Sequence, residues 1–159
     1  MENNPKRKLC IWIDADSCPA LVRNHTVKMA CRNNAEVYFV ANREIKCTEE
    51  GTFKMIVCPE EKDAADNYIL EHAEGADLVI TKDIVFADKL VAKKICVIND
   101  RGTVFNSENI KEKLSERNFD LLLSQAGVVQ HFHEGYDKKK FALFANTFDK
   151  VLHQQLRLL

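Results

Sequence analysis

Short strand-like runs alternate with longer stretches of helical periodicity along the first hundred residues of the chain. The runs at 9–13, 37–40, 54–58, 77–81 and 95–98 have the length and the apolar content of buried strands. Helical spacing of apolar residues fills 19–32, 63–75 and 83–92, with Pro19 in a first turn and Gly75 ending a helix. This alternation predicts an α/β fold, a three-layer, doubly wound and mostly parallel sheet.

Beyond Arg101 the pattern becomes helical, over 109–116, 119–125 and about 137–156. No repeat or linker interrupts the chain, which predicts a single domain over 1–159 with a core at about 9–125 and a C-terminal helical extension at about 126–159. The last amphipathic stretch could pack internally or on a second subunit, so a homodimer stays open.

Composition narrows the class of protein. Of 159 residues, 46% are hydrophobic and 30% are charged, and the formal net charge is -1, so a strongly basic nucleic-acid-binding domain is excluded. Any nucleic-acid contact must use local patches, and Lys138, Lys139 and Lys140 are explained most simply as a solvated face. The six cysteines lack metal-finger spacing and indicate reduced thiols of a cytoplasmic protein. No stretch is apolar enough for a membrane role.

Polar residues follow the ends of the expected strands. In open parallel sheets ligands bind beyond the carboxyl ends of the strands, where loops and helix N-termini converge. The strand at 9–13, the strand at 77–81 and the helix opening at residue 63 bring a set of carboxylate, hydroxyl and amide side chains to this edge: Asp14, Asp16, Ser17, Asp63, Asp66, Asn67, Thr81 and Asp83.

Several carboxylates at one edge predict a divalent-metal site, because their mutual repulsion is costly unless a cation or a shared proton compensates it. Mg²⁺ and Mn²⁺ prefer oxygen ligands and leave positions for water and substrate phosphates. Such a site could activate a water and stabilise the leaving oxygen of a phosphodiester. His131 and His133 could also touch a metal, although a solvated pair explains them more simply.

Each acid also has a structural interpretation. Asp63 could be the N-cap of the helix that follows it, Asp83 or Thr81 could cap the next helix, and Asp16 with Ser17 could cap the helix after Pro19. Asp66 could be a plain solvated helix position. Asp14 ends an apolar strand and has no adjacent helix to cap.

Four ordered segments carry a family resemblance: WIDADSCP at 12–19, VAN at 40–42, DAADN at 63–67 and DLVITKD at 77–83. Together with Arg101-Gly102 they resemble the YaiI/YqxD family, also called UPF0178, from about residue 9 to 125. The resemblance implies a fold similar to PIN-domain nucleases, which hold Mg²⁺ or Mn²⁺ with acids at the carboxyl edge and cut RNA.

The resemblance also implies roles for individual residues. Asp14, Asp66 and Asp83 are expected to bind the metal, with Asp16 and Asp63 supporting catalysis. The residues expected to contact substrate are Ser17, Asn67, Thr81 and Arg101.

Three functions follow as alternatives. The first is a metal-dependent nuclease acting on RNA, single-stranded nucleic acid or another phosphodiester. The second is a phosphohydrolase of the haloacid-dehalogenase kind, with Asp14 as nucleophile, Asp16 as acid/base, and Lys89 or Lys93 binding the phosphate. The third is a non-catalytic binding module that keeps the fold.

Overall fold

The computed structural model describes residues 7–47, 51–128 and 135–159, and a six-stranded sheet runs through its centre. The strands are β1 (Cys10–Asp14), β2 (Glu36–Ala41), β3 (Lys54–Val57), β4 (Leu78–Ile80), β5 (Cys96–Ile98) and β6 (Val104–Phe105). Their order is β3-β2-β1-β4-β5-β6, with all neighbours parallel except the antiparallel β5 and β6. The predicted α/β fold with a mostly parallel sheet is confirmed.

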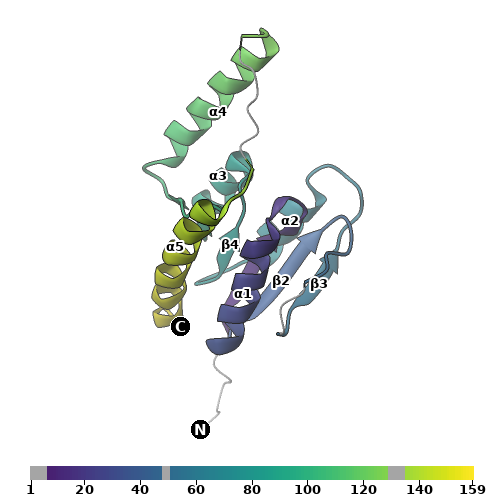
Figure 1. Ribbon diagram of the computed structural model, residues 1–159, viewed down its shortest axis with the longest axis vertical. Helices are drawn as coiled ribbons and strands as arrows, with labels where there is room; N and C mark the ends of the chain where they lie inside the picture. Colours follow the sequence, from purple (N-terminus) through teal and green to yellow (C-terminus); the bar gives the residue numbers. More distant parts are fainter. Residues whose placement is uncertain (1–6, 48–50, 129–134) are drawn as a thin grey trace.

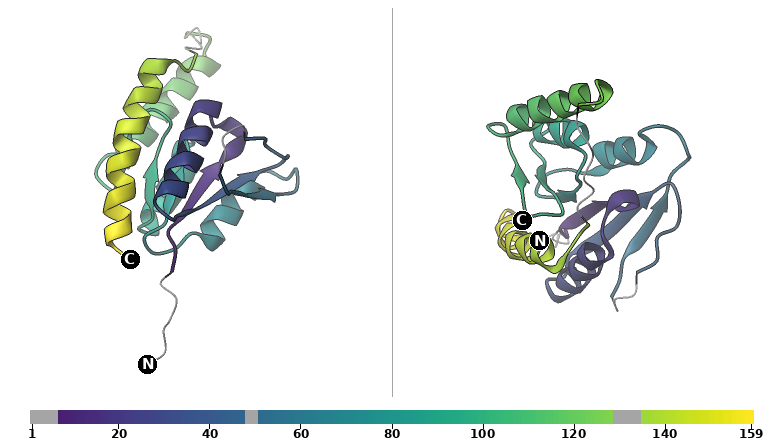
Figure 2. Two further views of the ribbon diagram at one scale, coloured as in Figure 1. Left: turned by 60° about the horizontal axis from the view of Figure 1, so that its bottom comes forward. Right: turned by 45° about the horizontal axis from the view of Figure 1, so that its top comes forward.

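Helices cover both faces of this sheet, which makes three layers (Figures 1 and 2). They are the short 3₁₀ helix η1 (Ala15–Ser17) and the α-helices α1 (Ala20–Arg32), α2 (Ala64–His72), α3 (Ile84–Ala92), α4 (Ile110–Gln125) and α5 (Lys138–Arg157). Helices α1 and α5 pack together on one face, whereas α2 and α3 lie on the other and α4 packs outside α3. No helix within the described ranges combines the length and the apolar character needed to cross a membrane.

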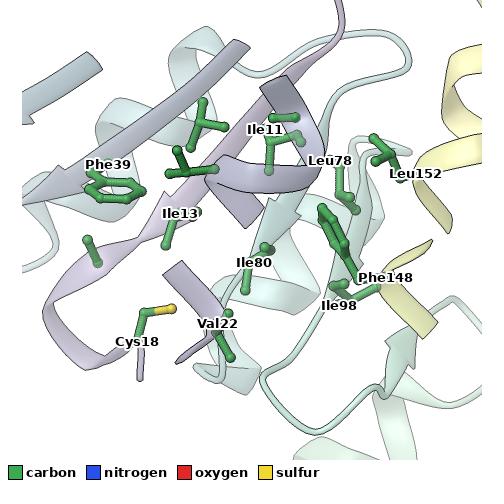
Figure 3. Close-up of a cluster of buried hydrophobic side chains, with 14 of the residues drawn as sticks. Ile11, Ile13, Cys18, Val22, Phe39, Leu78, Ile80, Ile98, Phe148 and Leu152 are labelled. Atoms are coloured by element: carbon green, nitrogen blue, oxygen red, sulfur yellow. The ribbon is translucent and has the colours of Figure 1, made fainter. Parts of the chain in front are cut away.

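Side chains of the central strands point alternately to the two faces of the sheet and fill the core on each face. Ile11 and Ile13 of β1 point into a core with α1 and α5 (Figure 3), while Trp12 between them points into a second core with α2 and α3. Two buried faces on each central strand explain why the strands consist almost wholly of apolar residues.

The C-terminal helix packs internally. Phe144, Phe148 and Leu152 of α5 are fully buried in the same core as α1, and the Gln155 side chain donates to the Ala76 carbonyl at 2.8 Å. This resolves the alternative that the sequence left open for the helix.

Some predicted boundaries are wrong. The helices expected at 109–116 and 119–125 are one helix, α4, because the polar Arg117-Asn118 pair interrupts the apolar pattern without breaking a helix. Helix α2 ends at His72, since Ala73 is already extended, and Gly75 lies in the following turn. Pro19 directly precedes α1 as its N-cap.

Candidate functional site

Asp14 and Thr81 meet at the carboxyl edge, between β1 and β4. The parallel register pairs Ile13 with Ile80, so the residues that follow each of them leave neighbouring strands side by side. The Thr81 hydroxyl donates to Oδ2 of Asp14 at 3.0 Å and accepts from the backbone N–H of Asp83 at 3.1 Å. Thr81 is only 3% exposed, so this hydroxyl holds the Asp14 carboxylate from within the fold.

The carboxylates at this edge repel one another. Burial raises the pKa of Asp14, the hydrogen bond from Thr81 opposes that rise, and Asp83 and Asp16 add to it. Burial likewise raises the pKa of Asp66 to about 7, with further repulsion from Asp14, Asp83 and Asp63. Acids from β1, from α2 and from the start of α3 are therefore within electrostatic reach of each other.

Asp83 is a helix cap as well as a member of this edge. Its Oδ1 accepts from the backbone N–H of Phe86 at 3.1 Å, which is the N-cap bond of α3. The capping interpretation of Asp83 is thus confirmed, while its second carboxylate oxygen makes no such bond to the helix.

The other two capping interpretations are wrong. Asp63 occupies the N-cap position of α2, but its backbone is left-handed (φ 61°) and its side chain makes no cap bond. Asp16 lies in η1, and its Oδ2 accepts from the backbone N–H of Asn42 at 3.0 Å instead of capping α1. Asp16 also lies 3.8 Å from Nε of Arg43, so it joins the end of β1 to the end of β2.

The residues expected to contact substrate lie around the acids in different settings. Ser17 lines a small cavity together with Asp14 and Thr81. Asn67 is exposed on the first turn of α2, and its backbone N–H donates to the Asp63 carbonyl at 2.9 Å. Arg101 is exposed in the turn after β5, and its backbone N–H donates to Oδ1 of Asn99 at 3.0 Å.

Asp100 belongs to this edge and was missed as a site residue. It follows β5, is 8% exposed and lines the same small cavity as Asp14 and Ser17. The Tyr136 hydroxyl donates to its backbone carbonyl at 2.6 Å, which brings the chain leading into α5 to the edge. The strand-end rule that selected Asp14 would have found Asp100 if it had been applied to β5.

The donor set suits Mg²⁺ or Mn²⁺ in part. The candidate ligands are the carboxylate oxygens of the acids at this edge, and these ions prefer such oxygens. A bound cation would relieve the repulsion among the carboxylates. However, no three His, Cys, Asp or Glu side chains in residues 7–47, 51–128 and 135–159 are grouped so that they could hold a metal ion. The arrangement fits an ion held by one or two carboxylates with water and phosphate completing its shell. The metal assignment stays a prediction, and His131 and His133 lie outside the described residues.

Comparison with known proteins places this edge in a family context. A family model described as "Uncharacterized BCR, YaiI/YqxD family" matches residues 12–154. A UPF0178 protein of Treponema denticola is 42% identical over 147 residues, covering 92% of this chain and 94% of that protein. A UPF0178 protein of Treponema pallidum is 39% identical over 150 residues, with 94% and 85% covered. One from Ectopseudomonas mendocina is 37% identical over 142 residues, with 89% and 95% covered. No solved structure matches the chain.

Proposed function

The chain belongs to the YaiI/YqxD (UPF0178) family, and from the acidic edge of its sheet we propose that it hydrolyses phosphodiester bonds of RNA or single-stranded nucleic acid with bound Mg²⁺ or Mn²⁺. The observation that carries the proposal is that carboxylates from three elements lie within electrostatic reach of one another at one strand edge. Asp14 comes from β1, Asp66 from α2 and Asp83 from the start of α3, and each of the other two raises the pKa of Asp66.

A bound Mg²⁺ or Mn²⁺ would lower the pKa of a water and neutralise phosphate charge. The chain itself would supply negatively charged carboxylates at fixed positions. Asp14 is suited to this because Thr81 holds its carboxylate at 3.0 Å. Asp83 is held by its cap bond to Phe86, and Asp66 stands on a helix, so all three acids are mounted on ordered elements.

Cations beside the acids favour an extended polyanion as substrate. Arg43 follows β2, Lys82 follows β4 and Arg101 follows β5, and all three are exposed. Strands β2, β1, β4 and β5 are consecutive in the sheet and strands lie roughly 4.8 Å apart, so these cations span about 15 Å along the edge. Several phosphates of one nucleic-acid strand can contact cations over that distance, whereas a single phosphomonoester is too small to contact all three cations.

The haloacid-dehalogenase alternative has one observation in its favour and two against it. The bond between Thr81 and Asp14 resembles what that mechanism requires. However, Oδ2 of Asp16 accepts from the backbone of Asn42, which directs the expected acid/base toward β2. The Lys93 ammonium donates to the Leu70 carbonyl, which leaves only Lys89, whose charge lowers the pKa of Asp66, to bind the phosphate. A fluoroberyllate adduct trapped on Asp14 would favour this alternative over a nuclease.

The test is cleavage of labelled single-stranded RNA and DNA by the purified chain with Mn²⁺. We expect cleavage by the wild type and a loss of at least about 100-fold in Asp14→Asn. Asp83→Asn is a sharp companion variant because asparagine keeps the helix cap while it removes the charge. Glu71→Gln, an exposed acid near the far end of α2, is the matched control and should cleave like the wild type.

Two outcomes would contradict the proposal. One is that both nucleic acids stay intact with Mn²⁺ and with Mg²⁺, which would leave the non-catalytic binding module. The other is that Asp14→Asn cleaves at the wild-type rate, which would assign the activity to another site or to a contaminant.

A further inference from the structure

Arg23 is a cation that reaches the carboxyl edge from the α1 face of the sheet. It lies in the first turn of α1, and its backbone N–H donates to the Pro19 carbonyl at 3.1 Å. Its guanidinium turns back along the chain, where Nη1 donates to the carbonyl of Cys18, the residue that follows η1. The charged end of Arg23 therefore lies beside η1, whereas Asp66 approaches the edge from α2 on the other face.

The guanidinium of Arg23 has a donor that the fold does not use. Its Nε is buried, and it is the only buried side-chain nitrogen or oxygen without a hydrogen-bond partner in residues 7–47, 51–128 and 135–159. No carboxylate within those ranges forms an ion pair with Arg23 either. A buried donor without an acceptor is costly, and more so when it carries charge. The stability of the fold therefore does not explain an arginine at this position.

The residue that Arg23 contacts belongs to the candidate site. Cys18 is buried and lines the small cavity that Asp14, Ser17 and Asp100 also line. Burial raises the pKa of the Cys18 thiol to about 12, the Arg23 charge opposes that rise, and Asp100 and Asp14 add to it. The guanidinium is therefore within electrostatic reach of the same thiol as two of the acids at this edge.

A second cation lies on the same cavity. Lys82, which follows β4, lines it together with Cys18, and its charge also lowers the pKa of the Cys18 thiol. The cavity has a volume of about 10 Å³, which is room for a water and not for a phosphate. An anion attracted by Arg23 and Lys82 would therefore lie over the mouth of the cavity, beside the acids.

We propose that Arg23 binds a phosphate of the substrate strand, next to the phosphate that the metal site would hold. The inference takes its substrate class, a single-stranded nucleic acid, from the proposed function. A guanidinium presents its donors in a planar fork that matches two phosphate oxygens. On binding, the side chain exchanges the Cys18 carbonyl for a phosphate, and its rotation brings the buried Nε to an acceptor.

Binding without cleavage tests this contact. Fluorescence anisotropy of a labelled single-stranded RNA in EDTA measures affinity under conditions in which metal-dependent cleavage does not occur. Arg23→Gln should raise the Kd about tenfold or more, because it removes a charge-assisted hydrogen bond to phosphate. Arg32→Gln is the matched control. It removes the same charge from the exposed last turn of α1 and should bind RNA like the wild type.

The salt dependence of binding identifies the partner of Arg23 as a phosphate. The slope of log Kd against log salt concentration should fall by about 0.7 in Arg23→Gln, the contribution of one phosphate contact on a single strand. Arg23→Lys keeps the charge, so it should keep the wild-type slope and lose less affinity. A residue that served only the fold would change the folded fraction and leave this slope unchanged.

Cleavage kinetics with Mn²⁺ separate binding from catalysis. Arg23→Gln should raise KM about tenfold and change kcat less than about threefold, since the contact is the same in the bound substrate and in the transition state. Asp14→Asn should lower kcat instead. If the wild type binds RNA through Arg23 but leaves it intact with Mn²⁺, the proposed nuclease function fails and the phosphate contact stands.

Urea unfolding shows whether Arg23 supports the fold. Arg23→Met keeps the apolar stem and removes the donors, and its urea midpoint should lie close to that of the wild type because the buried Nε has no acceptor to lose. A large loss of stability in Arg23→Met with unchanged RNA binding would assign Arg23 to the fold and overturn the proposal. It is also overturned if the wild type does not bind RNA in EDTA, if Arg23→Gln keeps the wild-type Kd and salt slope, or if Arg32→Gln weakens binding equally.

Discussion

The Thr81 hydroxyl donates a hydrogen bond to Oδ2 of Asp14 across the boundary between β1 and β4. The same oxygen accepts from the backbone N–H of Asp83, so one buried side chain contacts two of the three acids of the proposed site. It does so at the point where the strand order changes direction, with β2 on one side of β1 and β4 on the other.

Removing this hydroxyl should cost stability. Thr81→Val keeps the shape of the side chain but leaves the Asp83 N–H without its partner and removes the donor to Asp14. We expect the free energy of unfolding to fall by about 1 to 3 kcal/mol. Thr81→Ser retains the hydroxyl and should lose clearly less. Urea unfolding followed by the fluorescence of Trp12, the single tryptophan, measures both. Equal stability of the valine and serine variants would mean that the bond contributes nothing.

The raised pKa of Asp66 predicts a pH dependence of stability. The folded chain holds the Asp66 proton up to about pH 7, whereas an ordinary aspartate, with a pKa of 3.8, loses it near pH 4. Between these values the folded state binds more protons than the unfolded state, so this group's contribution to stability falls as pH rises. Burial and acidic neighbours raise the pKa of Asp14 too, in the same direction.

Asp66→Asn isolates that contribution. The variant should be more stable than the wild type at pH 8 without metal, and the difference should shrink toward pH 4, where both side chains are neutral. Urea midpoints at several pH values measure this difference. If Asp66→Asn is equally stable at all pH values, or less stable at pH 8, Asp66 does not experience the repulsion described.

Substitution of Asp77 should lower the stability of the fold and leave the rate of the proposed cleavage unchanged. Asp77 is 1% exposed, and its carboxylate accepts from Trp12 Nε1 at 3.1 Å and from the backbone N–H of Cys10 at 3.3 Å. It also pairs with Arg7 at 3.0 Å. Asp77→Ala leaves these donors unpaired and should cost about 3 to 5 kcal/mol.

A stability assay and a cleavage assay together separate these effects. Asp77 stands just before β4, at the opposite end of that strand from Thr81. At a temperature where Asp77→Ala is folded, its metal-dependent cleavage should therefore match the wild type. Glu71→Ala, at an exposed acid of α2, is the control and should unfold like the wild type. A stable Asp77→Ala would contradict a structural role for the network.

Gly102 is required for the turn between β5 and β6 to approach α5. Its φ is +81°, and a Cβ added there would lie 2.5 Å from the Leu143 carbonyl oxygen. Gly102→Ala must therefore bear both an unfavourable conformation and a backbone clash, and it should cost more than about 2 kcal/mol. Gly127→Ala has φ +71° with nothing nearby, so it measures the conformational part alone. Equal losses in the two variants would rule out the clash.

The sequence predicts the central sheet well for a physical reason. Leu78, Val79 and Ile80 are buried on both faces, so the strand is a short continuous apolar run, and its length and polar boundaries are typical of a central parallel strand. β6 was not predicted because Val104 and Phe105 are too few to show alternation. Its pairing with β5 depends on the intervening turn, where Asn99 accepts from two backbone N–H groups.

The candidate site could be predicted only as a set of residues on one edge. Strand ends locate Asp14 and Thr81 because parallel strands end together. The bond between these two residues depends on the register of β1 against β4, which no local pattern contains. The bond from Asn42 to Asp16 joins residues 26 apart in the chain, so no local pattern contains it, and the capping expectation for Asp16 is wrong for that reason. Asp63 has a left-handed backbone, and its side chain makes no cap bond.

Isothermal titration calorimetry of Mn²⁺ into the purified chain at pH 8 tests the central claim most directly. The account predicts saturable binding by the wild type and by Glu71→Gln, and its loss in Asp14→Asn. The result that would contradict it is either no binding of Mn²⁺ or Mg²⁺ by the folded wild type, or binding by Asp14→Asn with unchanged affinity.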